Sequence, residues 1–368
     1  MHPLIYLYLF LCVSCYATDT YLKLRSFYFD PDITQLPLEN WNNPTAQDYQ
    51  LIQDFLLKKK ERLIASPVEN RPFPSCELNT DFFDWTIRRM GSILALADCP
   101  VSGIEYFGND PSQREKCVIC YVTRKISASS RDYVKGLNLI IQSLKHFNFD
   151  GHLIYYIGGW PNLKKGRLKY ADVPYGFKPF LFEEAKDRGY KNILWLDGCC
   201  IPVKSLDPIF SQMKSKGLFL RSFYSNLENS CFNDGYKYLM PSLNITDLTE
   251  YEGFATPVLG INIENKGANQ LLNEWIKLTQ EKVPMLMGDE ISLGFLVNKL
   301  NLQEGRMPQH FYMEMLKDTG DFSYWKKEKR TVLLHQYDFV NTDVKIPENL
   351  FNKRNSQKKR LKRRRRAR

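Results

Sequence analysis

Apolar and polar positions follow two alternating periods from residue 116 to about residue 340. Short apolar runs of strand composition alternate with segments whose apolar residues recur every three to four positions, the period of a helix. Strands are predicted at residues 117–123, 152–158, 192–197, 217–223, 256–265 and 331–339. Helices are predicted at 132–147, 177–190, 266–282 and 287–300, and a further helix is predicted to start within 205–210. This alternation predicts an α/β fold with a mostly parallel, doubly wound sheet flanked by helices.

One predicted strand ends on an acid. The run NILWL, residues 192–196, stops at Asp197, which is followed by Gly198. Ligands of open α/β sheets bind beyond the carboxyl ends of the strands, so Asp197 is a candidate binding residue. A second acid, Asp207, precedes Pro208, which is typical of a helix N-cap with proline at the first helical position, and we assign it no catalytic role.

Residues 18–112 predict a helical preface that packs on the sheet domain. TAQDYQLIQDFLLKKKERLI, residues 45–64, has an amphipathic helical pattern, and Thr45 and Asp48 have the spacing of a capping box. A second helical stretch at 81–97 follows a proline-rich link at 67–74.

Residues 1–17 form an apolar leader that is shorter than the roughly 20 residues of a transmembrane helix. A signal peptide is the first interpretation, with cleavage after Ala17, and it predicts an exported protein: secreted, lumenal or periplasmic. A lipoprotein box that ends at Cys15, a short uncleaved signal anchor and a buried N-terminal segment remain alternatives.

The net charge of +10 resides in the last residues of the chain. The stretch 353–368 contains 11 Lys and Arg and no acid; without these 11 of the 51 basic residues, 40 remain against 41 acidic ones. We expect residues 346–368 to be a disordered basic tail, able to contact polyanions or an anionic membrane. The 43% hydrophobic content of the 368-residue chain indicates a globular body.

Seven of the nine cysteines lie beyond the leader, so at least one is not paired within the chain. Cys117 and Cys120 form a CxxC pattern, which occurs in zinc and redox sites. They lie in a predicted strand, however, where positions three apart face opposite sides of the sheet. We therefore interpret them as buried strand cysteines.

The order of these segments resembles the GT-A glycosyltransferases that use nucleotide sugars. The resemblance covers roughly residues 116–340, within a domain that we place at 113–345. It depends on LWLD at 194–197, SLDPIF at 205–210, TPVLGINIEN at 256–265, MGDEISLGF at 287–295 and TVLLHQYDF at 331–339. In that family, a DxD motif after the strand holds a divalent metal against the donor diphosphate. The resemblance implies that Asp197 binds metal and donor, that His335 is a further metal ligand, and that Asp289 and Glu290 are acceptor-side catalytic acids.

The chain departs from this pattern because Cys199 occupies the second acidic position of the motif. Mg²⁺ and Mn²⁺ prefer oxygen ligands, so we expect them to bind weakly or not at all. Lys178 is a candidate contact to the donor diphosphate, and a solvated lysine at a helix start is its alternative. Asp289 and Glu290 also suit a helix N-terminus through the helix dipole alone.

The resemblance implies transfer of a sugar from a nucleotide-sugar donor to a hydroxyl group of a glycan, protein or lipid. If the reaction inverts the anomeric configuration, Asp289 or Glu290 would take the proton of the acceptor. A non-catalytic binding protein on the same fold, and a polyanion-binding protein that acts through its tail, are the alternatives.

Overall fold

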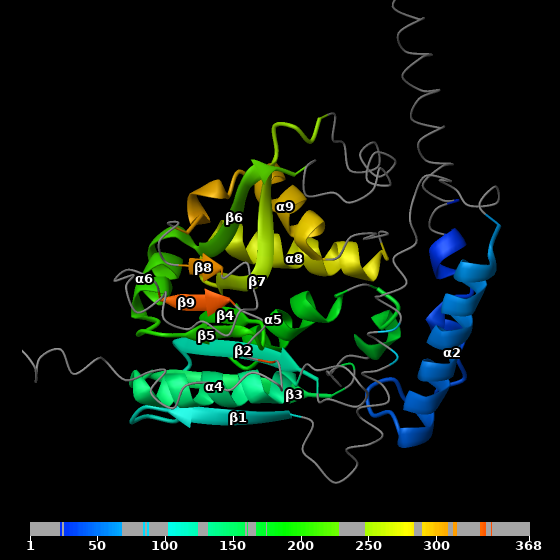
Figure 1. The fold of residues 1–368 in the computed structure, drawn as a ribbon, viewed down its shortest axis with the longest axis horizontal. Coiled ribbons are helices and arrows are strands. Elements are labelled where there is room, and N and C mark those ends of the chain that lie inside the picture. Colours follow the sequence, from blue (N-terminus) through cyan, green and yellow to red (C-terminus); the bar gives the residue numbers. More distant parts are fainter. Residues whose placement is uncertain are drawn as a thin grey trace, which may run out of the picture.

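Six strands form the central sheet of this computed structural model, in the order β1-β3-β2-β4-β7-β6 (Figure 1). The structure describes residues 23, 26–67, 84, 87, 102–123, 132–158, 160, 167–173, 175–227, 247–282, 289–307, 312–314, 332–335 and 340. The strands of the sheet are β1 (Ser102–Phe107), β2 (Lys116–Val122), β3 (Gly151–Ile157), β4 (Asn192–Leu196), β6 (Leu218–Asn226) and β7 (Glu252–Asn262).

The α/β class is confirmed, but the sheet is mixed rather than mostly parallel. β3, β2 and β4 are parallel neighbours. β1 is antiparallel to β3, while β7 is antiparallel to both β4 and β6. Apolar runs show where strands lie but not their direction, which the connections between them decide.

Alternating side chains of the inner strands build a core on each face of the sheet. On β2, Cys117 and Ile119 belong to one hydrophobic cluster, whereas Val118 and Cys120 belong to the other. Both cysteines are fully buried with free thiols. Strand geometry therefore separates the two sulfurs of the CxxC pattern, as predicted.

Helices cover both faces of this sheet. The first cluster includes side chains of α5, α8 and α9, and the second includes side chains of α4 and α6. The helices and 3-10 turns are η1 (Ile33–Gln35), α2 (Ala46–Ala65), α4 (Tyr133–His146), η3 (Arg167–Tyr170), α5 (Phe177–Asp187), α6 (Asp207–Lys216), α8 (Lys266–Gln280), α9 (Asp289–Lys299) and η6 (Gln303–Gly305).

A small second sheet has the order β5-β9-β8. It consists of β5 (Cys200–Pro202), β9 (Leu333–His335) and β8 (Tyr312–Glu314). β5 and β9 are antiparallel, with Cys200 opposite His335. This pairing joins the turn after β4 to the C-terminal part of the fold.

Helix α2 lies beside the sheet domain (Figure 1). It begins with the predicted capping box, in which the backbone N–H of Asp48 donates to Thr45 Oγ1 at 3.2 Å and the N–H of Thr45 donates to Asp48 Oδ2 at 2.8 Å. Lys59 of α2 forms a buried ion pair of 3.1 Å with Asp172, which fixes the helix to the sheet domain.

The sheet also begins earlier than the predicted boundary at residue 113, because the edge strand β1 pairs with β3. Of the predicted second helix, only Asp84 and Ile87 are described, and both are helical.

The predicted leader at 1–17 and the predicted tail at 346–368 lie outside the described residues. Export, and the contact of the tail with polyanions or membranes, therefore stay predictions. In the described part of the chain, no helix combines the length and the apolar character that crossing a membrane requires.

Candidate active site

Asp197 directly follows β4, at the carboxyl end of the parallel strands. Its backbone N–H donates to the Pro257 carbonyl at 2.9 Å, and its Oδ1 accepts from the indole N–H of Trp195 at 2.7 Å. One third of the side chain, 33%, remains exposed. The carboxylate is thus held in a fixed orientation and keeps access to solvent, as a ligand-binding group requires.

The turn after Asp197 packs closely against α4. A Cβ atom on Gly198 would lie 2.7 Å from Val122 Cγ1, and one on Gly136 would lie 1.7 Å from the Gly198 carbonyl oxygen. A larger residue at position 136 would therefore push the turn away from the helix. The two glycines allow the start of α4 to approach the end of β4.

Lys178, in the first turn of α5, connects three parts of the fold. Its ammonium nitrogen lies 2.5 Å from Asp289 Oδ2 and 3.7 Å from Asp197 Oδ1, and it donates to Thr256 Oγ1 at 3.0 Å. The side chain is only 4% exposed, so the alternative of a solvated lysine is wrong. Burial alone would lower the pKa of Lys178, but the charges of Asp197 and Asp289 raise it overall, and the ammonium group stays charged.

Asp289 and Glu290 are the first two residues of α9. Asp289 is buried against Lys178, whereas Glu290 is half-buried and its Oε1 accepts from the Thr256 N–H at 3.3 Å. Burial, reinforced by the charge of Asp289, raises the pKa of Glu290 to about 7. A carboxyl group that titrates near neutrality can take a proton as a general base.

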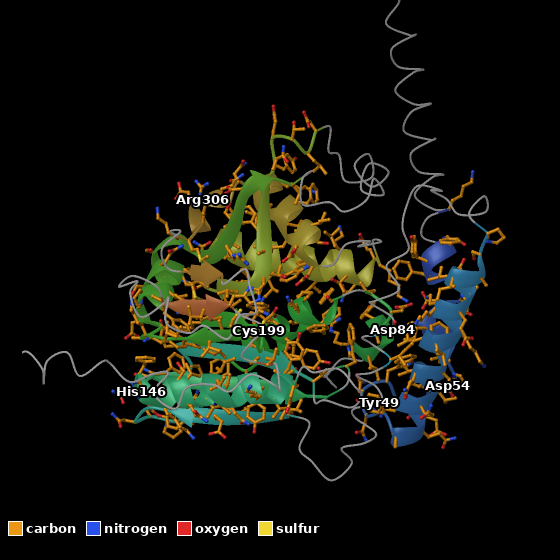
Figure 2. The ribbon with its side chains drawn as sticks, viewed as in Figure 1. Tyr49, Asp54, Asp84, His146, Cys199 and Arg306 are labelled. Atoms are coloured by element: carbon orange, nitrogen blue, oxygen red, sulfur yellow. The ribbon has the colours of Figure 1, made fainter. Side chains whose placement is uncertain are left out.

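His335 lies at the end of β9, beside two cysteines. Ligand atoms of Cys199, Cys200 and His335 all lie within 4.8 Å of one another. A hydrogen bond with Cys200, together with His335, lowers the pKa of Cys199 to about 6. Burial would lower the pKa of His335, but the Cys199 thiolate raises it overall. Cys199 is buried, and Figure 2 shows it in the sheet domain, away from Tyr49 and Asp54 of α2.

These donor atoms do not fit Mg²⁺ or Mn²⁺. The described group around His335 offers two sulfurs and no carboxylate, and Cys199, at the position of the second acid, is buried. Hard cations select oxygen ligands. We therefore assign neither cation to the group around His335.

The structure brings together the five candidate site residues Asp197, Lys178, Asp289, Glu290 and His335. Asp197 and Asp289 share Lys178, and Glu290 follows Asp289 directly. The Asp197 carbonyl accepts from the N–H of Cys200, which pairs with His335. Thr256 and Cys200 belong to the same region but were not predicted. Thr256 begins the segment TPVLGINIEN, but its contacts with Lys178 and Glu290 depend on how β7 packs against α5 and α9, which no local pattern records. For Cys200, the dipeptide Cys199-Cys200 was a visible signal in the sequence.

Asp207 differs from its prediction in detail. It is the first residue of α6, after the N-cap Leu206, rather than the N-cap itself. Its carboxylate accepts from Lys116 at 2.8 Å and from the Ser205 hydroxyl at 2.7 Å. Neither Lys116 nor Ser205 belongs to the residues around Lys178 or to those around His335, which agrees with a structural role for Asp207.

No protein-family model matches the chain, and no curated protein matches its sequence. Among solved structures, it is similar to the galactosyltransferase LgtC in complex with donor and acceptor sugar analogs, at 14% identity over 64% of this chain and 99% of that chain, with a TM-score of 0.34. Mouse xyloside xylosyltransferase 1 is 10% identical over 63% of this chain and 100% of that chain, with a TM-score of 0.36.

The bifunctional glycosyltransferase WbbM is 12% identical over 92% of this chain and 73% of that chain, with a TM-score of 0.36. All three neighbours are thus glycosyltransferases by name.

Proposed function

We propose that this chain is a glycosyltransferase, which moves a sugar from a nucleotide-sugar donor to a hydroxyl group of a glycan, protein or lipid acceptor. The observation that carries the proposal is the contact of Lys178 with both Asp197 and Asp289. It places a partly exposed acid at the end of β4 beside the acidic start of α9, with Glu290 adjacent. The resemblance of the sequence to the GT-A family supports the same function.

Glu290 is the residue we assign as the general base. Asp289 is buried and bound to Lys178, whereas Glu290 is half-buried and has a pKa raised to about 7. In an inverting transfer, the acceptor oxygen would bond to the anomeric carbon as the bond from that carbon to the diphosphate breaks. The hydroxyl proton would pass to the Glu290 carboxylate, and the nucleoside diphosphate would leave.

Asp197 and Lys178 would position the donor and the acids. Asp197 keeps 33% of its side chain exposed and is oriented by Trp195, so it can accept hydrogen bonds from donor hydroxyl groups. Lys178 holds Asp289 and Asp197 in place through its buried ammonium group. A direct contact of Lys178 with the diphosphate stays a prediction, as do Asp197 and His335 as ligands of a shared metal.

The test is release of nucleoside diphosphate by the purified full chain from a panel of nucleotide sugars, with and without hydroxyl acceptors. With an active donor, Asp197→Asn keeps the side-chain shape and removes the charge, so turnover should fall by roughly 10²-fold. Asp207→Asn is the matched control and should keep normal turnover.

Equal, small losses in both variants, at unchanged melting temperatures, would contradict the proposal. Binding of a nucleotide sugar without any turnover would favour the non-catalytic alternative. A product that retains its anomeric configuration would remove Glu290 as the base but leave the transfer itself in place.

A further inference from the structure

The group of Cys199, Cys200 and His335 has no part in the proposed transfer step. Its three ligand atoms lie within 4.8 Å of one another. All three residues are buried, with exposed fractions of 2%, 0% and 7%. Two thiols and an imidazole in such proximity form a soft ligand set, in contrast to the carboxylates around Lys178.

The backbone explains why two adjacent cysteines reach the same histidine. Neighbouring residues of a regular strand point to opposite faces. Cys199, however, lies in the turn before β5, and the N–H of Cys200 donates to the Asp197 carbonyl at 2.8 Å. Cys200 is the first residue of β5 and pairs directly with His335 across the antiparallel ladder. The turn thus allows the Cys199 sulfur to join the Cys200–His335 pair.

We propose that Cys199, Cys200 and His335 bind a thiophilic divalent cation of the Zn²⁺ class, with the fourth coordination position open. Zn–S bonds of about 2.3 Å and Zn–N bonds of about 2.0 Å require tetrahedral ligand atoms to lie roughly 3.5 to 3.8 Å apart. The ligand atoms of the three residues lie within 4.8 Å of one another, so small side-chain rotations would bring them to this spacing. On binding, each thiol would release its proton to solvent.

Soft ligands, rather than the carboxylates of a DxD motif, would thus select the metal. Thiolates and imidazole favour Zn²⁺ over Mg²⁺ and Mn²⁺. The fourth ligand would be water or an oxygen atom of a bound molecule. This inference does not depend on the proposed function, since the free protein binds the metal or does not.

The experiment titrates the reduced, metal-free full chain with Co²⁺, which reports thiolate coordination through its charge-transfer absorption. We expect this band to appear with one equivalent of Co²⁺, to disappear on addition of Zn²⁺, and to persist with excess Mn²⁺. Cys199→Ser and Cys200→Ser each leave one thiolate, so the band should fall by about half or more in each, and His335→Gln should weaken affinity by about 10-fold or more.

The strand cysteines provide matched controls. Cys117→Ser and Cys120→Ser change equally buried thiols that face opposite sides of the sheet, and both should keep the band. A chain with Cys76, Cys99 and Cys231 all changed to Ser should keep it too. Zn²⁺ should also raise the melting temperature of the wild type but not of Cys199→Ala.

Two results would overturn the inference. The first is absence of the band in wild-type protein whose thiols are shown by a thiol reagent to be reduced. The second is an unchanged band in Cys199→Ser. If Cys200→Ser fails to fold, as judged by circular dichroism, Cys199→Ala and His335→Gln decide the question.

Discussion

Two buried lysine clusters connect distant parts of this chain, and they differ in their balance of charge. The α2 charge cluster consists of Lys59, Lys282, Asp172 and Asp32. Asp172 lies 3.1 Å from Lys59 and 3.2 Å from Lys282, and Lys282 lies 2.9 Å from Asp32. Two ammonium groups thus meet two carboxylates, and each charge has an opposite neighbour.

The Lys178 cluster consists of Lys178, Asp197, Asp289 and Glu290, so a single ammonium group faces three carboxyl groups. Burial and the neighbouring charge of Asp289 raise the pKa of Glu290 to about 7. The excess negative charge of this cluster favours binding of a proton or another cation.

The difference indicates two separate tasks. In a balanced buried cluster each charge is compensated without a ligand, and the position of this cluster between α2 and the sheet domain suits a structural role. An unbalanced cluster with a perturbed pKa, at the end of a central strand, is typical of a functional site. Substitutions in and near the two clusters test this contrast, from the largest expected effect to the smallest.

Asp172→Asn should lower the free energy of unfolding by about 4 kcal/mol, because it leaves two buried ammonium groups with less compensating charge. Urea unfolding would measure this loss, while the folded fraction should keep its turnover. Asp289→Asn is the matched variant: Lys178 keeps Asp197 nearby and the excess negative charge falls, so stability should change less. Equal stability losses in both variants would refute the distinction between the clusters.

Glu290→Gln should reduce turnover by roughly 10²-fold or more, the usual contribution of a general base. In the wild type, kcat/KM should rise with pH through about 7, as the Glu290 carboxyl group loses its proton. The charged neighbours that set this pKa are Asp289, Lys178 and Asp197. A pH–rate profile would measure it, and an unchanged acid limb in Glu290→Gln would exclude Glu290 as the base.

Glu290→Gln should also stabilise the protein at pH 8. The pKa of Glu290 is about 7 in the folded state, against an ordinary value of 4.5. Between pH 4.5 and 7, the folded state therefore keeps a proton on Glu290 that the unfolded state has lost. The unfolding free energy contributed by Glu290 therefore falls as pH rises from about 4.5 to 7.

For a fully buried carboxyl group, a pKa rise of this size would lower the free energy of unfolding by on the order of 3 kcal/mol. We expect about half of this loss, because the Glu290 side chain is partly exposed. Glu290→Gln should thus be more stable than the wild type by about 1.5 kcal/mol at pH 8 and by much less at pH 4. Urea unfolding at both pH values would measure the difference. A constant difference between the variant and the wild type would contradict the proposed titration.

Asp207→Asn should have the smallest effect, below about 1 kcal/mol in stability. Its ion pair with Lys116 is exposed, with 67% of the Asp207 side chain accessible. Thermal unfolding would measure the change, and high salt should reduce the difference from the wild type. A larger loss would show that the start of α6 depends on this pair.

The sequence alone determined the local elements and several candidate residues. The strand and helix periods located β2, α4, β3, α5 and β4 within a few residues, and the Thr45–Asp48 spacing identified the start of α2. The end of the run NILWL placed Asp197 at the carboxyl end of a strand. These features depend on neighbours in the sequence, whose side-chain directions follow from the backbone period.

Only the tertiary structure decided the partners of these elements. It made β7 antiparallel to β4, buried Lys178 between Asp197 and Asp289, and paired Cys200 with His335. A periodic pattern records that a residue is buried, but it does not record which distant residue covers it. Charge balance and metal-ligand sets depend on such long-range contacts, so the chemistry of this site emerged from packing.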